Sequence, residues 1–176
     1  MNFQELALEV DAREQPVEAA WAYEIAIHST EARVDVFLNL ALLYFQCVDY
    51  GYQVRHQLRE EFVSGCWARS FQVLHMAERL FGNQTEVHFL RAYFSSIYSG
   101  EKGIEDLCER LAKRNDSLLP AAHLFLAGKT QHREAAQELL QSVKDGSTER
   151  QRYIKSVIEA ALNRDSTQAH IRRDSG

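Results

Sequence analysis

Two acid–histidine pairs have the residue types and spacing that chemistry requires. Glu24 and His28 lie four residues apart and His75 and Glu78 lie three apart, so on a helix each pair would share one face. Such a pair binds a metal ion when a second helix supplies more ligands. No Glu-x-x-His pair recurs on two helices, as a carboxylate-bridged two-metal bundle requires. We interpret both pairs as surface hydrogen bonds.

Cysteine chemistry is weakly indicated. Cys47, Cys66 and Cys108 are odd in number, widely spaced and without a C-x-x-C pair, which favours neither a zinc site nor a disulfide framework. We expect Cys108 on a packing face, and Cys47 and Cys66 to be more accessible but without a base to activate them. There is also no glycine-rich phosphate loop. The sequence therefore predicts no catalytic residue, no metal site and no cofactor, and a protein that is not an enzyme.

The elements that would position these side chains are predicted to be helices. Hydrophobic residues make up 45% and charged residues 26% of the 176 residues, as in ordinary globular proteins. Two prolines and eight glycines are few for a chain rich in strands and turns, while strong helix formers are abundant. An all-α fold follows.

Charge is distributed unevenly along the chain. The net charge is −5; residues 1–61 hold four Arg and no Lys against eleven Asp plus Glu, whereas residues 144–176 hold seven basic against five acidic residues. An acidic balance argues against nucleic acid as a partner, because binding phosphates needs a basic face. The acidic N-terminal part would favour a basic partner, unless its charges only form a solvated surface.

The termini and apolar runs indicate no targeting to a membrane. The first fifteen residues carry acidic residues where a secretory leader needs a basic start and an apolar run. The longest apolar stretch, 34–48, is interrupted by Asp35, Asn39 and Gln46 and is too short to span a bilayer. We expect a cytoplasmic protein that does not interact with membranes.

A repeat at a spacing of 34 residues organises the N-terminal part. Each copy has a large residue, then Leu, a small residue and another large residue, at Phe3, Leu6, Ala7 and Val10 and again at Phe37, Leu40, Ala41 and Tyr44. A small–large–small pattern follows the first copy at Ala19, Tyr23 and Ala26. This pattern resembles the tetratricopeptide repeat, a helix–turn–helix unit with that period.

Helix signals continue the pairing along the chain. Pro16 suits the first turn of a helix, Ser29 or Thr30 would cap the next one, and Thr148 with Gln151 forms a capping box. We predict helices over 2–13, 16–28, 31–46, 67–81, 85–97, 104–111, 120–127, 135–143 and 148–163. A single domain would then span 1–163, with a flexible tail over 164–176.

The repeat loses its register after the second copy. Residues 34 positions beyond Ala19, Tyr23 and Ala26 are all polar, and the matching pattern appears 17 residues later, from Ser70 onward. We infer an insertion at about 51–66, in which Gly65 would end a short helix.

The resemblance implies about four helical pairs stacked as a right-handed superhelix, plus a C-terminal capping helix. It further implies a concave groove, lined by the first helices, that binds a peptide or helix of another protein. Residues expected on the groove side are Leu8, Asp35, Leu38, Leu42, Phe45, Glu86, Phe89 and Tyr93.

Several alternatives remain open for the groove. Segment 31–46 is apolar all round, so something must cover Leu38, Leu42 and Phe45. The cover is the insertion 51–66, the C-terminal helix, a partner protein or a second copy in a homodimer. The corresponding functions are a protein-binding module, a small chaperone-like or immunity-type protein that masks one partner, a homo-oligomerisation module or, least favoured, an enzyme on a helical scaffold.

Overall fold

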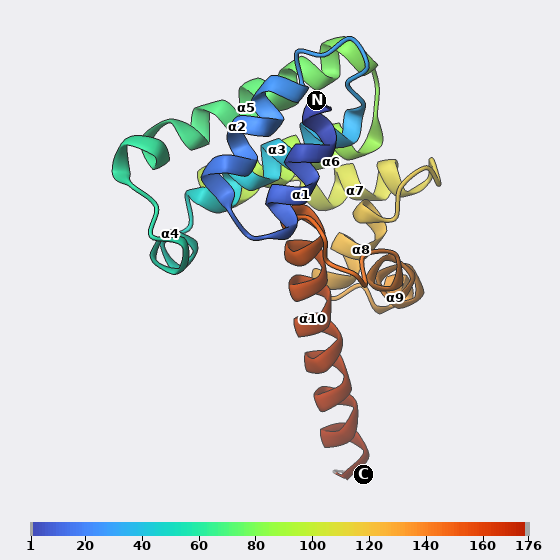
Figure 1. Ribbon diagram of the computed structural model, residues 1–176. Coiled ribbons are helices and arrows are strands. Elements are labelled where there is room, and N and C mark those ends of the chain that lie inside the picture. Colours follow the sequence, from blue (N-terminus) through green and yellow to red (C-terminus); the bar gives the residue numbers. More distant parts are fainter. Residues whose placement is uncertain (1, 175–176) are drawn as a thin grey trace.

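Helices form all the regular structure in the part of the chain that the computed structural model describes, which is 2–174 for the backbone and 2–165 for the side chains (Figure 1). The all-α prediction is confirmed for these residues. The helices are α1 (Phe3–Ala12), α2 (Pro16–Ala26), α3 (Val34–Cys47), α4 (Tyr50–His56), α5 (Glu60–Phe81), α6 (Thr85–Ser99), α7 (Ile104–Ala112), α8 (Leu119–Leu126), η1 (Thr130–His132), α9 (Arg133–Ser142) and α10 (Glu149–Asp174).

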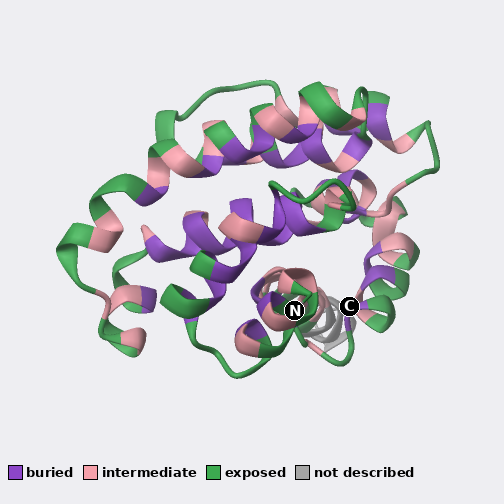
Figure 2. Ribbon diagram, turned by 45° about the horizontal axis from the view of Figure 1, so that its top comes forward, coloured by how far each residue is buried: buried purple, intermediate pink, exposed green. Residues whose placement is uncertain are grey.

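Neighbouring helices pack in chain order. The closest associations are α1 with α2, α3 with α5, α7 with α8, and α8 with α9, while α2 also packs on α3 and α5 on α6. Figure 2 shows the buried residues on the sides of the helices that face one another. The small residues of the repeat, Ala7 and Ala41, are fully buried, because close helix packing leaves no room for a larger side chain.

Local signals place several helix ends correctly. Pro16 is the first residue of α2, where its missing N–H leaves no hydrogen bond unmade. Gly100 and Gly103 both have positive φ and make the turn between α6 and α7. Thr148 and Gln151 form the predicted capping box, in which each side chain accepts a hydrogen bond from the other residue's backbone N–H.

Other predicted boundaries are wrong. Segment 51–66 is not one inserted unit: it lies in α4, a short connection and the first turns of α5, and Gly65 lies inside α5. Helix α3 begins at Val34, so neither Ser29 nor Thr30 caps it. The backbone of α10 continues as helix through Asp174, where an irregular tail was expected. The rest of that predicted tail, 175–176, lies outside the described residues.

An aromatic cluster joins four helices at the centre of the fold. Phe45 of α3 stacks on Phe94 of α6 with ring centroids 4.2 Å apart. It also contacts Trp67 of α5, Tyr93 of α6 and Tyr153 of α10, with centroids 6.1–6.4 Å apart. Aromatic rings bury large apolar areas, so this cluster ties α10 to the body formed by α1–α9.

Removing the Phe94 ring, on which Phe45 stacks, tests how much the aromatic cluster contributes to stability. Phe94 is fully buried, so we expect Phe94→Ala to lower the free energy of unfolding by about 3–5 kcal/mol through lost burial and the cavity left behind. The matched control is Ile97→Ala on the same helix, where Ile97 is 60% exposed and a change of about 0.5 kcal/mol or less is expected. Urea unfolding measures both, and equal effects would contradict the packing described.

Candidate functional site

A helix of the chain itself, α10, covers the face on which the sequence predicted a groove. The N-terminal part of α10 lies against α3, α8 and α9, and its C-terminal part projects away from the body (Figure 1). We call the surface beneath it the α10 seat. Its residues come from α1, α3, α6, α8 and α9 and are Asp11, Asp35, Leu42, Phe45, Glu86, Phe89, Tyr93, His123 and Leu139.

The middle of the α10 seat is apolar. Leu42 of α3, together with Phe89 and Tyr93 of α6, faces an apolar stripe of α10. That stripe consists of Tyr153, Ile154, Val157 and Ile158. The hydroxyls of Tyr93 and Tyr153 share a hydrogen bond. An apolar cavity of about 40 Å³ remains between the two surfaces, so α10 does not fill its seat completely.

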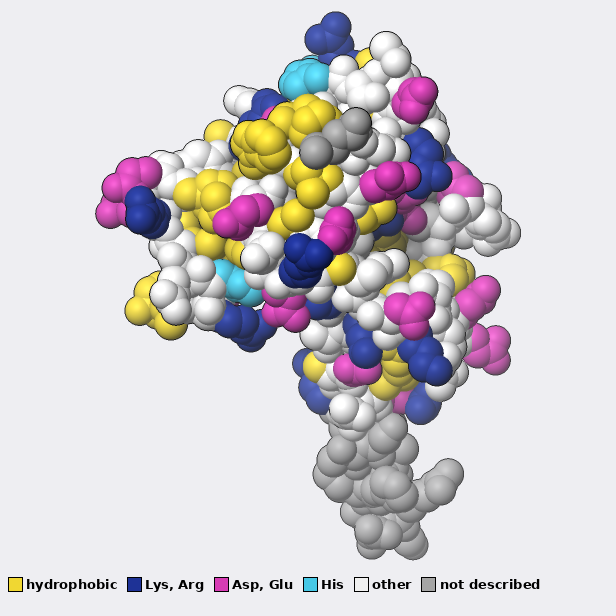
Figure 3. All heavy atoms as spheres, in the orientation of Figure 1, with side chains coloured by type: hydrophobic (Ala, Val, Ile, Leu, Met, Phe, Trp, Pro, Cys, Tyr) yellow, Lys and Arg dark blue, Asp and Glu magenta, His cyan; other side chains and the backbone are white. Residues whose placement is uncertain are grey.

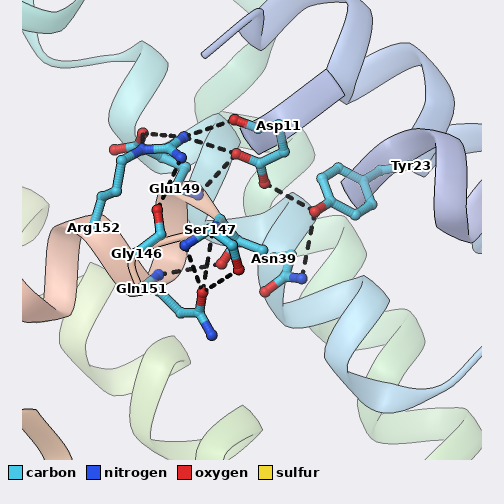
Figure 4. A network of polar contacts seen from close by, with 9 residues as sticks. Asp11, Tyr23, Asn39, Gly146, Ser147, Glu149, Gln151 and Arg152 are labelled. Atoms are coloured by element: carbon cyan, nitrogen blue, oxygen red, sulfur yellow. Dashed lines mark hydrogen bonds and ion pairs between the residues drawn. The ribbon is translucent and has the colours of Figure 1, made fainter. Parts of the chain in front are cut away.

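A buried carboxylate fixes the start of α10 (Figure 4). Asp11 of α1 is 1% exposed, and its Oδ1 accepts hydrogen bonds from the Glu149 backbone N–H at 2.8 Å and from Arg152 Nη2 at 2.9 Å. Its Oδ2 accepts from the Tyr23 hydroxyl at 2.8 Å. A negative charge at a helix N-terminus is stabilised by the helix dipole. Asp11 therefore acts as a cap for α10, supplied from the opposite end of the described chain.

The charges of this cluster do not balance. Arg152 Nη2 lies 2.9 Å from Asp11 and 3.2 Å from Glu149, so one guanidinium serves two largely buried carboxylates. Burial raises the pKa of Asp11 and of Glu149, and the bonds to Arg152 oppose that shift. Without Arg152, two carboxylates would be buried together and uncompensated.

A second basic residue of α10 bridges two acidic residues at the rim. Arg150 donates through Nη2 to Asp35 of α3 at 2.9 Å and through Nη1 to Glu86 of α6 at 3.1 Å. The Asp35 side chain is 55% exposed and that of Glu86 is 33% exposed, so water weakens both ion pairs. These contacts select the orientation of α10 more than they stabilise it.

Near α10, two buried polar atoms of the described residues have no hydrogen-bond partner. One is Nδ1 of His123, whose ring lies edge-on to Phe89 and Tyr93 beside the cavity. The other is Oδ1 of Asn39, whose Nδ2 lies 3.4 Å from the Tyr23 hydroxyl. Burial lowers the pKa of His123, because the imidazolium would lose its hydration. Unpaired buried polar atoms cost stability, so these sites weaken the seat.

The groove residues expected from the sequence come together here with two exceptions, Leu8 and Leu38. Leu38, Leu42 and Phe89 are 5% exposed or less, and Leu42 and Phe89 lie beneath α10. Phe45 and Tyr93 contact Tyr153 of α10, and Asp35 and Glu86 bind Arg150. Leu8 instead stays 41% exposed on α1. Of the covers considered for Leu42 and Phe45, the structure provides the C-terminal helix.

The acid–histidine pairs serve structural contacts. Glu24 of α2 accepts from Arg69 Nε at 2.7 Å and from the Tyr44 hydroxyl at 2.8 Å, which links α2 to α5 and α3. Glu78 binds Arg91 at 2.7 Å and lies 3.9 Å from His75. Within the described residues, no three His, Cys, Asp or Glu side chains gather as a metal ion would need.

The cysteines are less accessible than expected. Cys47, Cys66 and Cys108 are all buried free thiols, so the predicted accessibility of the first two is wrong. Cys47 of α3 and Cys66 of α5 are neighbours, and the proximity of Cys66 together with burial raises the pKa of the Cys47 thiol. Cys66 also donates to the Phe62 carbonyl at 3.2 Å.

Sequence reasoning missed most of the residues that meet at α10. His123, Arg150, Arg152 and Tyr153 were not predicted as site residues. The signal that pointed to them was the charge difference between the acidic residues 1–61 and the basic residues 144–176. The acidic part was interpreted as a solvated surface or as favouring a basic partner, and in the structure a basic helix of the same chain lies against it.

Comparisons with protein-family models, curated proteins and solved structures found no match to the chain. No helix in the described residues has the length and apolar character to cross a membrane.

Arg152 is expected to contribute far more to stability than Arg150. Arg152→Ala leaves Asp11 and Glu149 buried without a counter-charge and should lower the free energy of unfolding by about 3–5 kcal/mol. Arg150→Ala, two residues earlier on the same helix, removes only partly exposed pairs and should cost about 1 kcal/mol or less. Urea unfolding at pH 7 measures both. Similar losses would show that the Asp11 cluster does not hold α10.

His123 should make stability depend on pH. Its pKa lies below the unfolded value of 6.5, so below pH 6.5 the unfolded chain takes up a proton that the folded chain resists. We therefore expect the free energy of unfolding of the wild type to fall, relative to that of His123→Gln, as pH decreases from 7 to 5. Asp11 and Glu149, whose pKa values are raised, act in the opposite direction in both proteins, so the difference between them isolates His123.

Parallel curves for wild type and His123→Gln would mean that His123 is not desolvated in the folded chain.

Proposed function

We propose that this protein is a protein-binding module whose groove recognises a helix of a partner protein. The observation that carries the proposal is the occupation of the α10 seat by an amphipathic helix. A surface built by α1, α3, α6 and α8 that binds one helix through an apolar stripe and flanking acidic residues has the chemistry to bind another. The 34-residue repeat and the chain-order packing of the helices support a right-handed tetratricopeptide-like superhelix as the scaffold.

The binding mode would follow from the side chains of the seat. Phe45, Phe89 and Tyr93 are rigid aromatic anchors of the kind that dominates binding energies. Asp35 and Glu86 would orient a basic residue of the partner at the rim. No step of this function requires a cofactor or a catalytic group.

Site-specific cross-linking tests the proposal in cells. A photo-reactive amino acid is placed at position 35 or at position 86, both at the rim of the α10 seat. The control position is 138 on α9, because Glu138 is not one of the residues of the seat. We expect both rim positions to trap the same partner protein and the control position to trap none of it. The purified partner should then bind the wild type at least about tenfold more tightly than Asp35→Lys/Glu86→Lys.

Two results would reject the proposal. Rim positions that cross-link only to the chain's own α10 would show a closed structural core. Equal trapping at position 138 would show that the rim has no specific partner.

A further inference from the structure

We infer that the partner helix carries the pattern of α10 and binds by displacing it. This inference rests on the proposed function and names the partner's chemistry. The pattern consists of an Arg at the position of Arg152, followed by large apolar residues one, two, five and six positions later, as at Tyr153, Ile154, Val157 and Ile158. An Arg two positions earlier, as at Arg150, would add rim contacts.

The charges of the two surfaces select a basic helix. Asp11, Asp35 and Glu86 on the seat are all acidic, and Arg150 and Arg152 of α10 meet them at 2.9–3.1 Å. A helix with an acidic residue in place of Arg152 would bring a second carboxylate next to the buried Asp11. Like charges in a buried contact are strongly unfavourable, so the cluster discriminates against such helices.

The spacing of the apolar residues selects the face of the helix. Positions 153, 154, 157 and 158 lie on one side of an α-helix, since residues three and four apart are neighbours. On the seat they meet Leu42, Phe89 and Tyr93. A shift of the helix by one residue would separate the Arg from Asp11 or the apolar stripe from these side chains.

Several features make α10 replaceable. The cavity of about 40 Å³ and the unpaired Nδ1 of His123 show that α10 leaves part of the seat unsatisfied. A partner with a larger side chain or a hydrogen-bond donor at that place would bind better than α10 does. The connection 143–148 joins α9 to α10, so withdrawal of α10 changes no connection among α1–α9.

Displacement also determines the apparent affinity. A partner binds only the fraction of molecules whose seat is open, so its apparent dissociation constant equals the intrinsic one divided by that fraction. Weakening the hold of α10 therefore raises the open fraction and tightens partner binding. A mutation in α10 that tightens binding of another helix is expected only if that helix replaces α10. Binding at a different surface would not be affected by the mutation.

The first experiment uses a fluorescent peptide that spans residues 147–165 and the full chain as receptor. We expect weak binding to the wild type and binding tighter by on the order of tenfold or more to Arg152→Ala, because the peptide returns the missing guanidinium to Asp11. Lys155→Ala is the control on the same helix, since Lys155 bonds only an exposed carbonyl of Lys144, and it should behave as the wild type. Equal binding to all three receptors would overturn the inference.

A designed helix tests the pattern apart from the sequence of α10. It is built from Ala, Glu and Lys and carries only the Arg and the four apolar residues at the stated positions. We expect it to bind the Arg152→Ala chain within about tenfold of the natural peptide and to lose that binding when its Arg is replaced by Glu. Loss of binding by the designed helix, while rim cross-links still trap a partner, would reject the α10 pattern and leave the proposed function standing.

Hydrogen exchange of the wild type covers the case in which Arg152→Ala does not fold. We expect the amides of 153–161 in α10 to be protected at least about tenfold less than those of α3, which means that α10 leaves while the body stays folded. Equal protection would show that α10 opens only with global unfolding and would overturn the inference. Light scattering of the wild type measures its mass in solution. A dimer whose two copies exchange α10 would overturn the inference, because the occupant of the seat would then be a second copy of this chain.

Discussion

The Asp11 carboxylate is the contact on which the arrangement of the described chain depends. It joins α1 to the start of α10, two elements separated by most of the sequence, through the Glu149 amide and the Arg152 guanidinium. The same carboxylate binds the Tyr23 hydroxyl, so it also connects α1 to α2. Because Asp11 is buried, each of these bonds must be present for the carboxylate to stay in the core. The position of α10 along its seat follows from them.

Once α10 starts at Asp11, the remaining contacts of the seat are determined by helix geometry. Arg150 is placed between Asp35 and Glu86, and the apolar stripe from Tyr153 onward is placed over α3 and α6. This arrangement explains why α3 is apolar on all sides. It packs against α2 and α5 on one side and is covered by α10 on the other.

The α10 seat combines contacts that stabilise α10 with features that leave part of the contact unsatisfied. A buried charge cluster and the ring contacts of Tyr153 hold α10, yet a pocket lined by the unpaired His123 lies beside the same contact. Buried polar clusters specify one geometry more than they add stability. The contacts of the α10 seat therefore define one position of α10 without filling the whole of its surroundings.

The sequence by itself determined the all-α class, most of the helices and the need for a cover over segment 31–46. The 34-residue repeat, the apolar periodicity and local signals such as Pro16 and the Thr148–Gln151 capping box predicted the helices, because these signals act within a few residues. The apolar surface of segment 31–46 showed that Leu42 and Phe45 needed a cover. The same local reasoning gave wrong limits for the segment 51–66, where Gly65 lies inside α5 because packing of α5 against α3 outweighs its weak helix propensity.

Only the tertiary structure decided what covers Leu42 and Phe45. A stripe of apolar residues predicts that one face of a helix is buried. It does not identify the element that covers that face, because the hydrophobic effect is not directional. The choice of α10 depends on Asp11 meeting Glu149 and Arg152, a contact between residues 138 and 141 positions apart that no local pattern encodes. The role of His123 beside the cavity was equally invisible, because burial and a missing hydrogen bond are properties of the packed chain.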